Sequence, residues 1–527
     1  MRLAARVWLG VAAMVLSACA GGTADSDTPA ADPNGSFSAG LPSNPDHLLP
    51  GRSGSSNFDY AIWTPPTVID PESGELSNAV AESVESEDSR VWTIKLREGW
   101  TFHNGDPVTA QSFADSWNAT AYGPNAFDNN SAFAMFKGYA EMNPAEGKPT
   151  AETLSGVKVV DELTLEVTLT EPSSMFPYQL ASTTFAPIPE QALDDLDTFD
   201  KLPIGNGPFR LTGDGLAPGV QTVTLERYDD YAGEPARAKS VEVTFFKDSS
   251  ALYTAFKAGD IDVTFVGDTD VADAKVSYPD RFTAFSFPAL IYLGFPSWDE
   301  RFDDSRVRQA FSLAVDREAI VTSLLRGSGE VASGVAPDVL EGGGGDECAN
   351  CEYDPDEAKS LLEAAGGFDG KLTLWTYQED AANVTVLEAI GNQLRTNLGI
   401  QDVELNPQPV AELYPALSEE KVDGPFLLYA GATYPHLYAM SSILFSATGW
   451  ANTTKYDGEE AGRLLAEAAA SSDDLLPLTE QATEVALADV PIAPLYHPGA
   501  GMVWSENVGN VVPEFLGGPH FAGITAR

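Results

Sequence analysis

The side chains best suited to acid–base or metal chemistry are five histidines, and each stands alone in the sequence: His47, His103, His436, His497 and His520. A zinc hydrolase typically carries His-Glu-x-x-His, and an α/β hydrolase carries its serine in Gly-x-Ser-x-Gly. Neither pattern occurs in the 527 residues, and the phosphate-binding pattern Gly-x-x-x-x-Gly-Lys is also absent. The sequence therefore predicts a protein that is not an enzyme, holds no metal and needs no cofactor.

The N-terminus predicts export and a lipid anchor. Arg2 and Arg6 precede an apolar run that ends in Leu16-Ser17-Ala18-Cys19. A charged start, a short apolar core and small residues before a cleavage site are typical of a secretory signal peptide, here residues 1–18. The position of Cys19 resembles the lipobox of bacterial lipoproteins, in which the cysteine thiol receives a diacylglycerol. We expect Cys19 to be the lipid attachment site; the alternative is an ordinary signal peptide followed by a chance cysteine.

The other two cysteines form Cys348-Ala-Asn-Cys351, directly after a run of glycines. In an intracellular protein this spacing indicates a redox centre or half of a zinc site. No second pair and no nearby histidine accompany it here, and an exported protein meets an oxidising compartment. The expectation is a disulfide that closes a glycine-rich loop.

Composition limits the partners of the chain. Residues 19–34 are rich in Ala, Gly, Asp and Pro and predict a flexible linker. The formal net charge of −48 argues against nucleic-acid binding and against adsorption to anionic lipid, so membrane contact is expected through the anchor alone. The acidic excess either attracts cationic ligands or serves solubility.

Helical and strand patterns are mixed along the body without strict alternation, which indicates an α/β (mixed α+β) protein with several domains. Residues 109–122 predict a helix capped by Thr109, and residues 157–169 predict a hairpin that turns at Asp161 and Glu162. Residues 305–325 predict one long amphipathic helix that ends at Gly327. Residues 372–377 predict a strand that carries Trp375.

Five separated stretches together resemble one family, the extracytoplasmic solute-binding proteins of oligopeptide and dipeptide ABC importers. The most specific is a strand-to-helix signature whose matching residues include Leu96-Arg97-Glu98-Gly99 and Phe102-His103-Asn104-Gly105. The stretches lie in family order at residues 76–108, 203–210, 252–263, 302–327 and 353–366, and Pro491–His497 follows them late in the chain.

The resemblance implies a two-lobed, periplasmic-binding-protein-like fold with a hinge and an additional domain inserted into the first lobe. Carried onto this sequence, it divides the chain as follows: lobe I at 35–75, 200–288 and 495–527, the insert at 76–199, and lobe II at 289–494. Ligand between the lobes favours closure, and the closed form is what the permease recognises.

The same resemblance suggests where a ligand binds. Peptide-binding members hold the α-ammonium group of the peptide with an Asp in a stretch that matches residues 428–436 here, and Thr433 stands at that position. Another acid, such as Asp59 or Asp380, would then serve, or the ligand would have no free N-terminus. The predicted ligand-binding residues are Arg52, Ser55, Asn57, Trp375, Tyr429, Gly431, Thr433, Tyr434 and His436.

The resulting expectation is a monomeric, lipid-anchored receptor on the outer face of the cytoplasmic membrane. It would capture oligopeptides for an ABC permease and ATPase complex. Two alternatives stay open on the same fold: a non-peptide solute such as a sugar, an opine or a metal chelate, or a ligand-sensing signalling lipoprotein.

Overall fold

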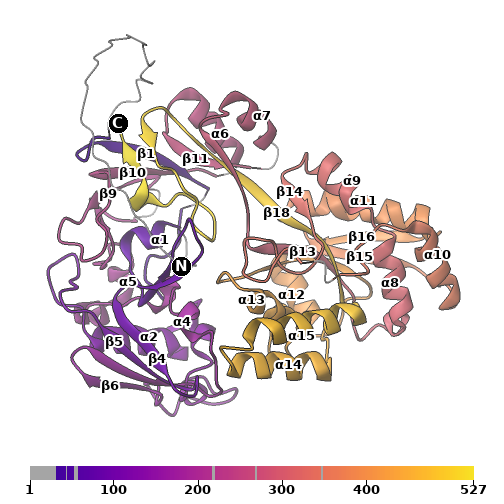
Figure 1. The fold of residues 1–527 in the computed structure, drawn as a ribbon, viewed down its shortest axis with the longest axis horizontal. Helices are drawn as coiled ribbons and strands as arrows, with labels where there is room; N and C mark the ends of the chain where they lie inside the picture. The colour runs from indigo at the N-terminus through magenta and orange to yellow at the C-terminus, as the bar shows by residue number, and fades with distance from the viewer. Residues whose placement is uncertain are drawn as a thin grey trace, which may run out of the picture.

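The computed structural model describes residues 31–42, 44–52, 57–216, 220–247, 249–267, 270–345 and 348–527. Cys19, Ser55 and the signal peptide lie outside the described residues, as does the side chain of Asn57. Figure 1 shows two halves that lie side by side and are joined by the long strand β18 (Ile492–Trp504).

The first half is built around strands from the beginning, the middle and the end of the chain. Parallel pairing places β1 between β10 and β11, and antiparallel pairing adds β9 and then β8. Its elements are β1 (Ser36–Leu41), α1 (Asn57–Ile62), β8 (Phe209–Thr212), β9 (Thr222–Arg227), β10 (Ser240–Phe245), α6 (Ser249–Ala258), β11 (Val263–Val266), α7 (Val271–Ser277), β12 (Phe282–Ser286), β19 (Val508–Gly509) and β20 (Thr525–Ala526).

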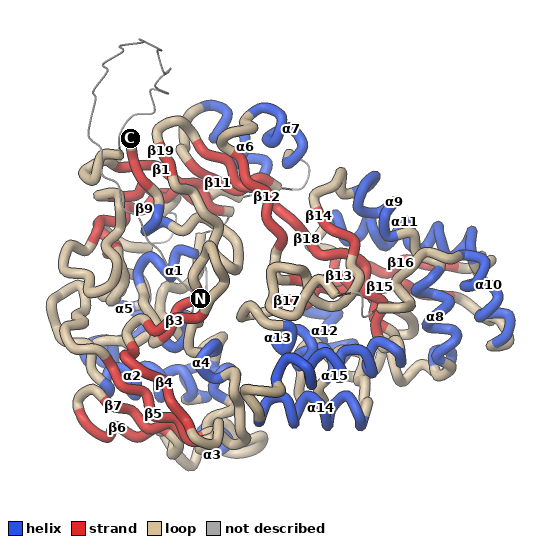
Figure 2. Tube along the Cα trace, in the orientation of Figure 1, coloured by secondary structure: helices blue, strands red, loops and turns tan. Residues whose placement is uncertain are grey.

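A smaller sheet lies below these strands in the view of Figure 2, in the order β4-β5-β7-β6. Its strand β5 alternates buried and exposed residues, and the buried face packs on α2 around Trp117. The elements of this region are β2 (Thr67–Ile69), β3 (Leu76–Asn78), β4 (Ala81–Ser86), β5 (Val91–Leu96), α2 (Ala110–Ala121), α3 (Tyr139–Met142), β6 (Val157–Asp161), β7 (Thr164–Thr168), α4 (Phe176–Gln179) and α5 (Leu196–Phe199).

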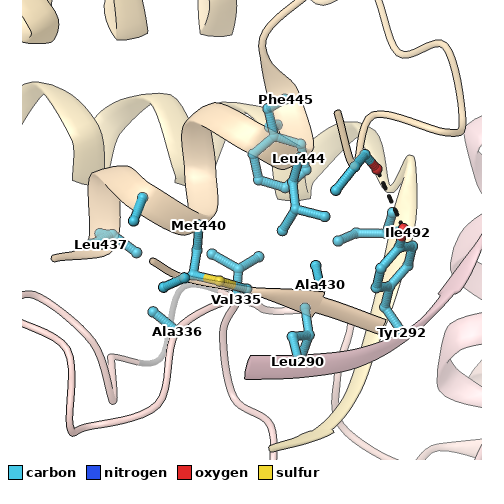
Figure 3. Close-up of a cluster of buried hydrophobic side chains, with 14 of the residues drawn as sticks. Leu290, Tyr292, Val335, Ala336, Ala430, Leu437, Met440, Leu444, Phe445 and Ile492 are labelled. Atoms are coloured by element: carbon cyan, nitrogen blue, oxygen red, sulfur yellow. Dashed lines mark hydrogen bonds between the residues drawn. The ribbon is translucent and has the colours of Figure 1, made fainter. Parts of the chain in front are cut away.

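The second half has the strand order β16-β15-β17-β13, with helices around it (Figure 2). Strands β13 and β17 pack against α13 to form the apolar core drawn in Figure 3. Its elements are β13 (Ala289–Gly294), α8 (Ser305–Leu313), α9 (Arg317–Ala319), a π-turn (Ile320–Leu324), β14 (Gly329–Val331), α10 (Pro355–Ala364), β15 (Leu372–Tyr377), α11 (Ala381–Asn397), β16 (Val403–Gln408), α12 (Val410–Ser418), β17 (Phe426–Gly431), α13 (Leu437–Phe445), α14 (Glu459–Ala470) and α15 (Leu475–Asp489).

Two chain segments pass between the halves. The first joins β12 to β13 through Phe287 and Pro288. The second is β18, which pairs with β13 and β14 up to Pro498 and with β11 and β12 from Gly499 onward. Two adjacent crossings of this kind form a hinge, because only a few backbone dihedrals separate the halves.

The halves also touch away from the hinge. The backbone N–H of Ser174 donates to the carbonyl oxygen of Ala469 at 2.8 Å. Met175 is buried within the apolar core of the second half, and the ring of Tyr178 lies 5.8 Å from that of Tyr434. Residues 174–178 are therefore packed against the second half.

Several local predictions are confirmed, and one is wrong. Thr109 caps α2, residues 157–168 form the expected hairpin, and 372–377 form a strand. The single helix predicted over 305–325 is broken, because Asp316 accepts a hydrogen bond from the Ala319 backbone and so starts a new helix. Amphipathic spacing continues through the break, which is why periodicity alone missed it.

A disulfide joins Cys348 to Cys351. Within the described residues, no helix is long and apolar enough to cross a membrane. The same residues contain no group of three or more His, Cys, Asp or Glu side chains placed to hold a metal ion.

A candidate ligand-binding cleft

A cavity of about 710 Å³ lies against the first half, and residue Thr433 of the second half completes its wall. Three segments supply most of its lining: the end of α1 with the residues after it, the β2–β3 hairpin, and residues 510–523. A volume of this size holds a small molecule or a short peptide.

Charged side chains of both signs line this cavity. The acids are Asp70, Glu72, Glu234 and Glu514. Asp70 sits in the turn of the β2–β3 hairpin, where its Oδ1 accepts hydrogen bonds from the Ser73 and Glu72 backbone. The Ser73 bond is the main reason that the pKa of Asp70 lies below its usual value, so this carboxylate stays charged to a lower pH than an ordinary aspartate.

His520 and Glu514 form a pair on the wall made by residues 510–523, with Nδ1 2.6 Å from Oε1. Burial lowers the pKa of His520, but the hydrogen bond and charge of Glu514, with Asp70 and Glu234, outweigh it and raise the pKa above 6.5. His520 is therefore protonated up to a higher pH than an ordinary histidine, and in that form it offsets part of the acidic charge.

The cavity also contains neutral and cationic groups. The guanidinium of Arg97 donates to the carbonyls of Ala79 and Ala81, which holds it at the cavity edge. Burial raises the pKa of Tyr60, so its phenol stays neutral. Arg237 is the second arginine of the lining. The arrangement suits a ligand that carries opposite charges at different points, because acids, two arginines and hydroxyl groups line the same space.

A smaller cavity of about 260 Å³ lies on the second half beside the hinge. Aromatic rings from four separate segments line it: Phe287, Tyr377, Tyr429 and Tyr496. Asp380 and Asn383, from the start of α11, complete the wall.

The two cavities share one strand and its exit loop. Tyr429 on β17 lines the small cavity, and Thr433 lines the large one. Four residues of extended chain span about 13 Å at the usual rise per residue. A ligand of a few residues is therefore long enough to contact both.

The structure brings only part of the predicted site together. Thr433 is exposed to the large cavity, and Tyr429 is 40% exposed beside the small one. Gly431 lies between them, and a Cβ placed there would come within 2.6 Å of the Tyr429 hydroxyl. Glycine at this position lets the tyrosine fold over the strand end.

The other described candidates line none of these cavities. Arg52 pairs with Asp197 at 2.7 Å and lies over the Phe127 ring, so its charge is used inside the first half. His436 is buried, and its Nδ1 accepts the Tyr438 backbone N–H at the start of α13.

Tyr434 and Trp375 are likewise placed for packing. Tyr434 is buried, and burial raises its pKa well above the usual value. Trp375 is half-buried on β15, and its Nε1 finds no hydrogen-bond partner among the described residues. Arg52, His436, Tyr434 and Trp375 therefore stabilise the fold in this structure rather than face a ligand cavity.

Sequence reasoning missed the β2–β3 hairpin and residues 510–523, which provide most of the large cavity. The hairpin carries a turn signal in Asp70-Pro71-Glu72-Ser73-Gly74, and the C-terminal segment carries Gly517-Gly518-Pro519. These signals predict turns, but nothing local shows that two turns 440 residues apart meet.

Comparison with known proteins identifies the fold and the family. The sequence profile of bacterial extracellular solute-binding proteins, family 5, matches residues 75–452. The oligopeptide-binding protein OppA of Bacillus subtilis (strain 168) is 25% identical over an alignment of 538 positions, gaps included, and the alignment covers 96% of each chain. Heme-binding protein A of Haemophilus influenzae (strain ATCC 51907 / DSM 11121 / KW20 / Rd) is 24% identical over an alignment of 550 positions, gaps included, which covers 100% of this chain and 99% of that protein.

Among solved structures, the unliganded open form of the periplasmic murein tripeptide-binding protein MppA superimposes with a TM-score of 0.79 at 21% identity. The match covers 94% of this chain and 98% of that one. The fold class predicted from the sequence is therefore confirmed, and the profile match extends over more than half of the residues. The chain belongs to family 5 of the bacterial extracellular solute-binding proteins, which are receptors of ABC importers that work outside the cytoplasm and catalyse no reaction.

Proposed function

We propose that this chain captures an oligopeptide in the cleft between its halves and presents it to the permease of an ABC importer. In this proposal the halves are the two predicted lobes, and residues 76–199 are the insert of lobe I. The observation that carries the proposal is the large cavity, which is lined by the first half and by Thr433 of the second. A ligand bound there contacts both halves and so favours their closure.

The charges of the cavity suit a peptide with free ends. A zwitterionic peptide carries an ammonium group at one end and a carboxylate at the other. Asp70 and Glu234 supply negative charge, and Arg97 supplies positive charge. The hairpin that carries Asp70 lies beside the Thr433 loop, since a Cβ at Gly74 would come within 3.9 Å of Pro435. Asp70 is therefore one candidate for the acid that Thr433 does not provide.

The membrane attachment in this proposal is a diacylglyceryl group on Cys19. Lipid on that residue and a linker over 19–34 would keep the cleft close to the permease. Mass spectrometry of the mature N-terminus tests this point, because lipidation adds a defined mass to Cys19 and an unmodified N-terminus contradicts it.

A non-peptide solute is the second candidate, and the similarity to heme-binding protein A favours heme as its best-defined form. Heme iron needs an axial ligand such as histidine. Among the residues that line the large cavity, His520 is the histidine available, and its Nδ1 is already paired with Glu514. Because Nδ1 is paired with Glu514, Nε2 is the nitrogen that could bind the heme iron. Replacement of His520 therefore tests the heme hypothesis.

The deciding experiment is native mass spectrometry of the protein purified from the producing cells, followed by denaturation and identification of the released solute. Peptides of mixed sequence support the proposal. Release of a sugar or a chelate alone contradicts it, and a heme signal with a Soret band that His520→Ala abolishes favours the second candidate.

A further inference from the structure

The small cavity beside the hinge has the composition of an aromatic cage. Tyr377 ends β15, Tyr429 lies on β17, Tyr496 lies on β18, and Phe287 is in the hinge. These segments are far apart in sequence, yet they bring four rings to the lining of about 260 Å³. Ring faces carry negative potential and attract cations.

One carboxylate belongs to this cavity. Asp380 caps α11, and its Oδ1 accepts hydrogen bonds from the backbone N–H groups of Ala382 and Asn383 at 2.9 and 3.3 Å. Within the described residues its Oδ2 accepts none, and the residue is only half-buried. The full negative charge of Asp380 exceeds the roughly half positive charge expected of the helix start.

The remaining polar groups of the wall are neutral. The Asn383 side-chain amide donates to the Tyr377 hydroxyl at 2.7 Å, which leaves that hydroxyl proton available to another acceptor. Burial raises the pKa of Tyr377, and Asp380 raises it further, so the phenol stays protonated. No Lys, Arg or His lines this cavity among the described residues, so an anionic ligand would find repulsion and no counter-charge.

We propose that this cavity binds an organic cation of the ligand, with Asp380 as its counter-ion and the rings of Tyr377, Tyr429 and Tyr496 around it. This inference rests on the proposed peptide function. The cation is an ammonium or guanidinium group, either on a Lys or Arg side chain or at the peptide N-terminus. A lysine stem packs along the rings while its ammonium reaches Asp380.

The test measures binding of pentapeptides by calorimetry. One set has lysine scanned through pentaalanine, a second has norleucine at the same places, and both are made with free and with acetylated N-termini. Norleucine matches the lysine stem and removes only the charge. We expect lysine at one position to bind about tenfold more tightly than norleucine there, from cation–π attraction and a charge-assisted hydrogen bond.

Asp380→Asn is the decisive variant, because asparagine caps a helix as well as aspartate does and removes the charge alone. We expect it to abolish the preference for lysine and to leave norleucine peptides within about twofold. Glu379→Gln is the matched control: Glu379 is the adjacent acid, accepts the Val410 N–H, and does not line the cavity. It should keep the preference. Tyr429→Leu removes one of the proposed rings at an exposed position and should independently reduce the preference for lysine over norleucine.

The comparison of free with acetylated peptides distinguishes the two sources of the cation. A lysine preference that survives acetylation identifies the side chain, whereas an acetylation penalty that Asp380→Asn removes identifies the N-terminal ammonium. If peptides bind but neither dependence changes in Asp380→Asn, the cation site is refuted and the peptide function stands. If no peptide of any set binds, the proposed function itself fails.

Discussion

Arg317 is the buried cation whose removal should most affect the second half. Its side chain is 2% exposed and meets no carboxylate among the described residues. Nε donates to the Pro494 carbonyl at 2.6 Å, Nη1 donates to the Ser312 and Val315 carbonyls, and Nη2 donates to Ser312 Oγ. Burial lowers the pKa of Arg317 to about 9, so the group is still charged at neutral pH. The residue thus ties the broken helix at 314–316 to β18, the strand that crosses the hinge.

The expected loss of stability can be estimated from the hydrogen bonds that Arg317 donates. Arg317→Met keeps most of the volume but removes four donated bonds and leaves the buried Pro494 and Val315 carbonyls without this partner. Each unsatisfied group costs about 1–3 kcal/mol, and relief from burying a charge offsets part of the sum. We expect Arg317→Met to lower the free energy of unfolding by about 2–3 kcal/mol. Arg317→Ala adds a cavity and should lower it by about 4 kcal/mol.

Urea unfolding followed by tryptophan fluorescence measures these values. Arg306→Met is the control, because Arg306 is half-exposed and pairs with Asp304 at 2.6 Å, and exposed ion pairs of this kind contribute little to stability. An Arg317→Met variant that unfolds within about 0.5 kcal/mol of the Arg306→Met variant would refute the assignment of a structural role to these four bonds.

Three further variants test other parts of the molecule. Thr433→Asp should tighten calorimetric binding of free-N-terminus peptides about tenfold and leave acetylated peptides unchanged, since it adds a carboxylate to the large cavity; equal effects on both would contradict the placement. Because the folded pKa of His520 is raised, its contribution to stability is complete below about pH 6.5 and is lost as pH rises through the folded value. His520→Gln should therefore lower Tm more at pH 6 than at pH 9, and a pH-independent loss would argue against the pair. Burial raises the pKa of Asp262, but hydrogen bonds from Asn507, Ser38 and Ser505 outweigh it and lower the pKa, so this contribution exists above about pH 3.8 and fades below it. Asp262→Asn should cost about 1–3 kcal/mol at pH 7 and less at pH 3 by calorimetry.

Sequence patterns predicted the features that local physics decides. Thr109 caps its helix because a hydroxyl can satisfy a free backbone N–H, and residues 157–168 form the predicted hairpin because a short turn joins its two strands. The helix break at Asp316 was not predicted, because the apolar spacing continues across it. The hydrogen bond that starts the new helix depends on one side-chain rotamer, which the spacing does not show.

The cavities could not be predicted in this way. Thr433 was predicted as a ligand-binding residue from the match of residues 428–436 to a family motif, and it lines the large cavity. His436 stood three residues away and was expected beside it, but the chain turns into α13 there and directs the imidazole onto its own backbone. Asp70 and His520 carry no local sign of their shared cavity, because that neighbourhood is created by long-range packing alone.

The contact between residues 174–178 and the second half limits how the cleft can open. Met175 lies 4% exposed among side chains of the second half, and fully exposing such a side chain costs about 1.5–3 kcal/mol. In the view of Figure 1, α4 and α14 lie below the place where β18 crosses between the halves. One motion keeps both this contact and the hinge crossings intact: a rotation of one half about the line that joins the contact to the hinge. In that rotation the backbone dihedrals change at Phe287–Pro288 and at Pro498–Gly499. Tyr429 and Thr433 move as one body with β17 in such a rotation, because β17 is paired to β13 along its whole length. A ligand that touches Thr433 and the first half therefore acts directly on the rotation, and an occupied aromatic cavity at Phe287 acts on the hinge itself.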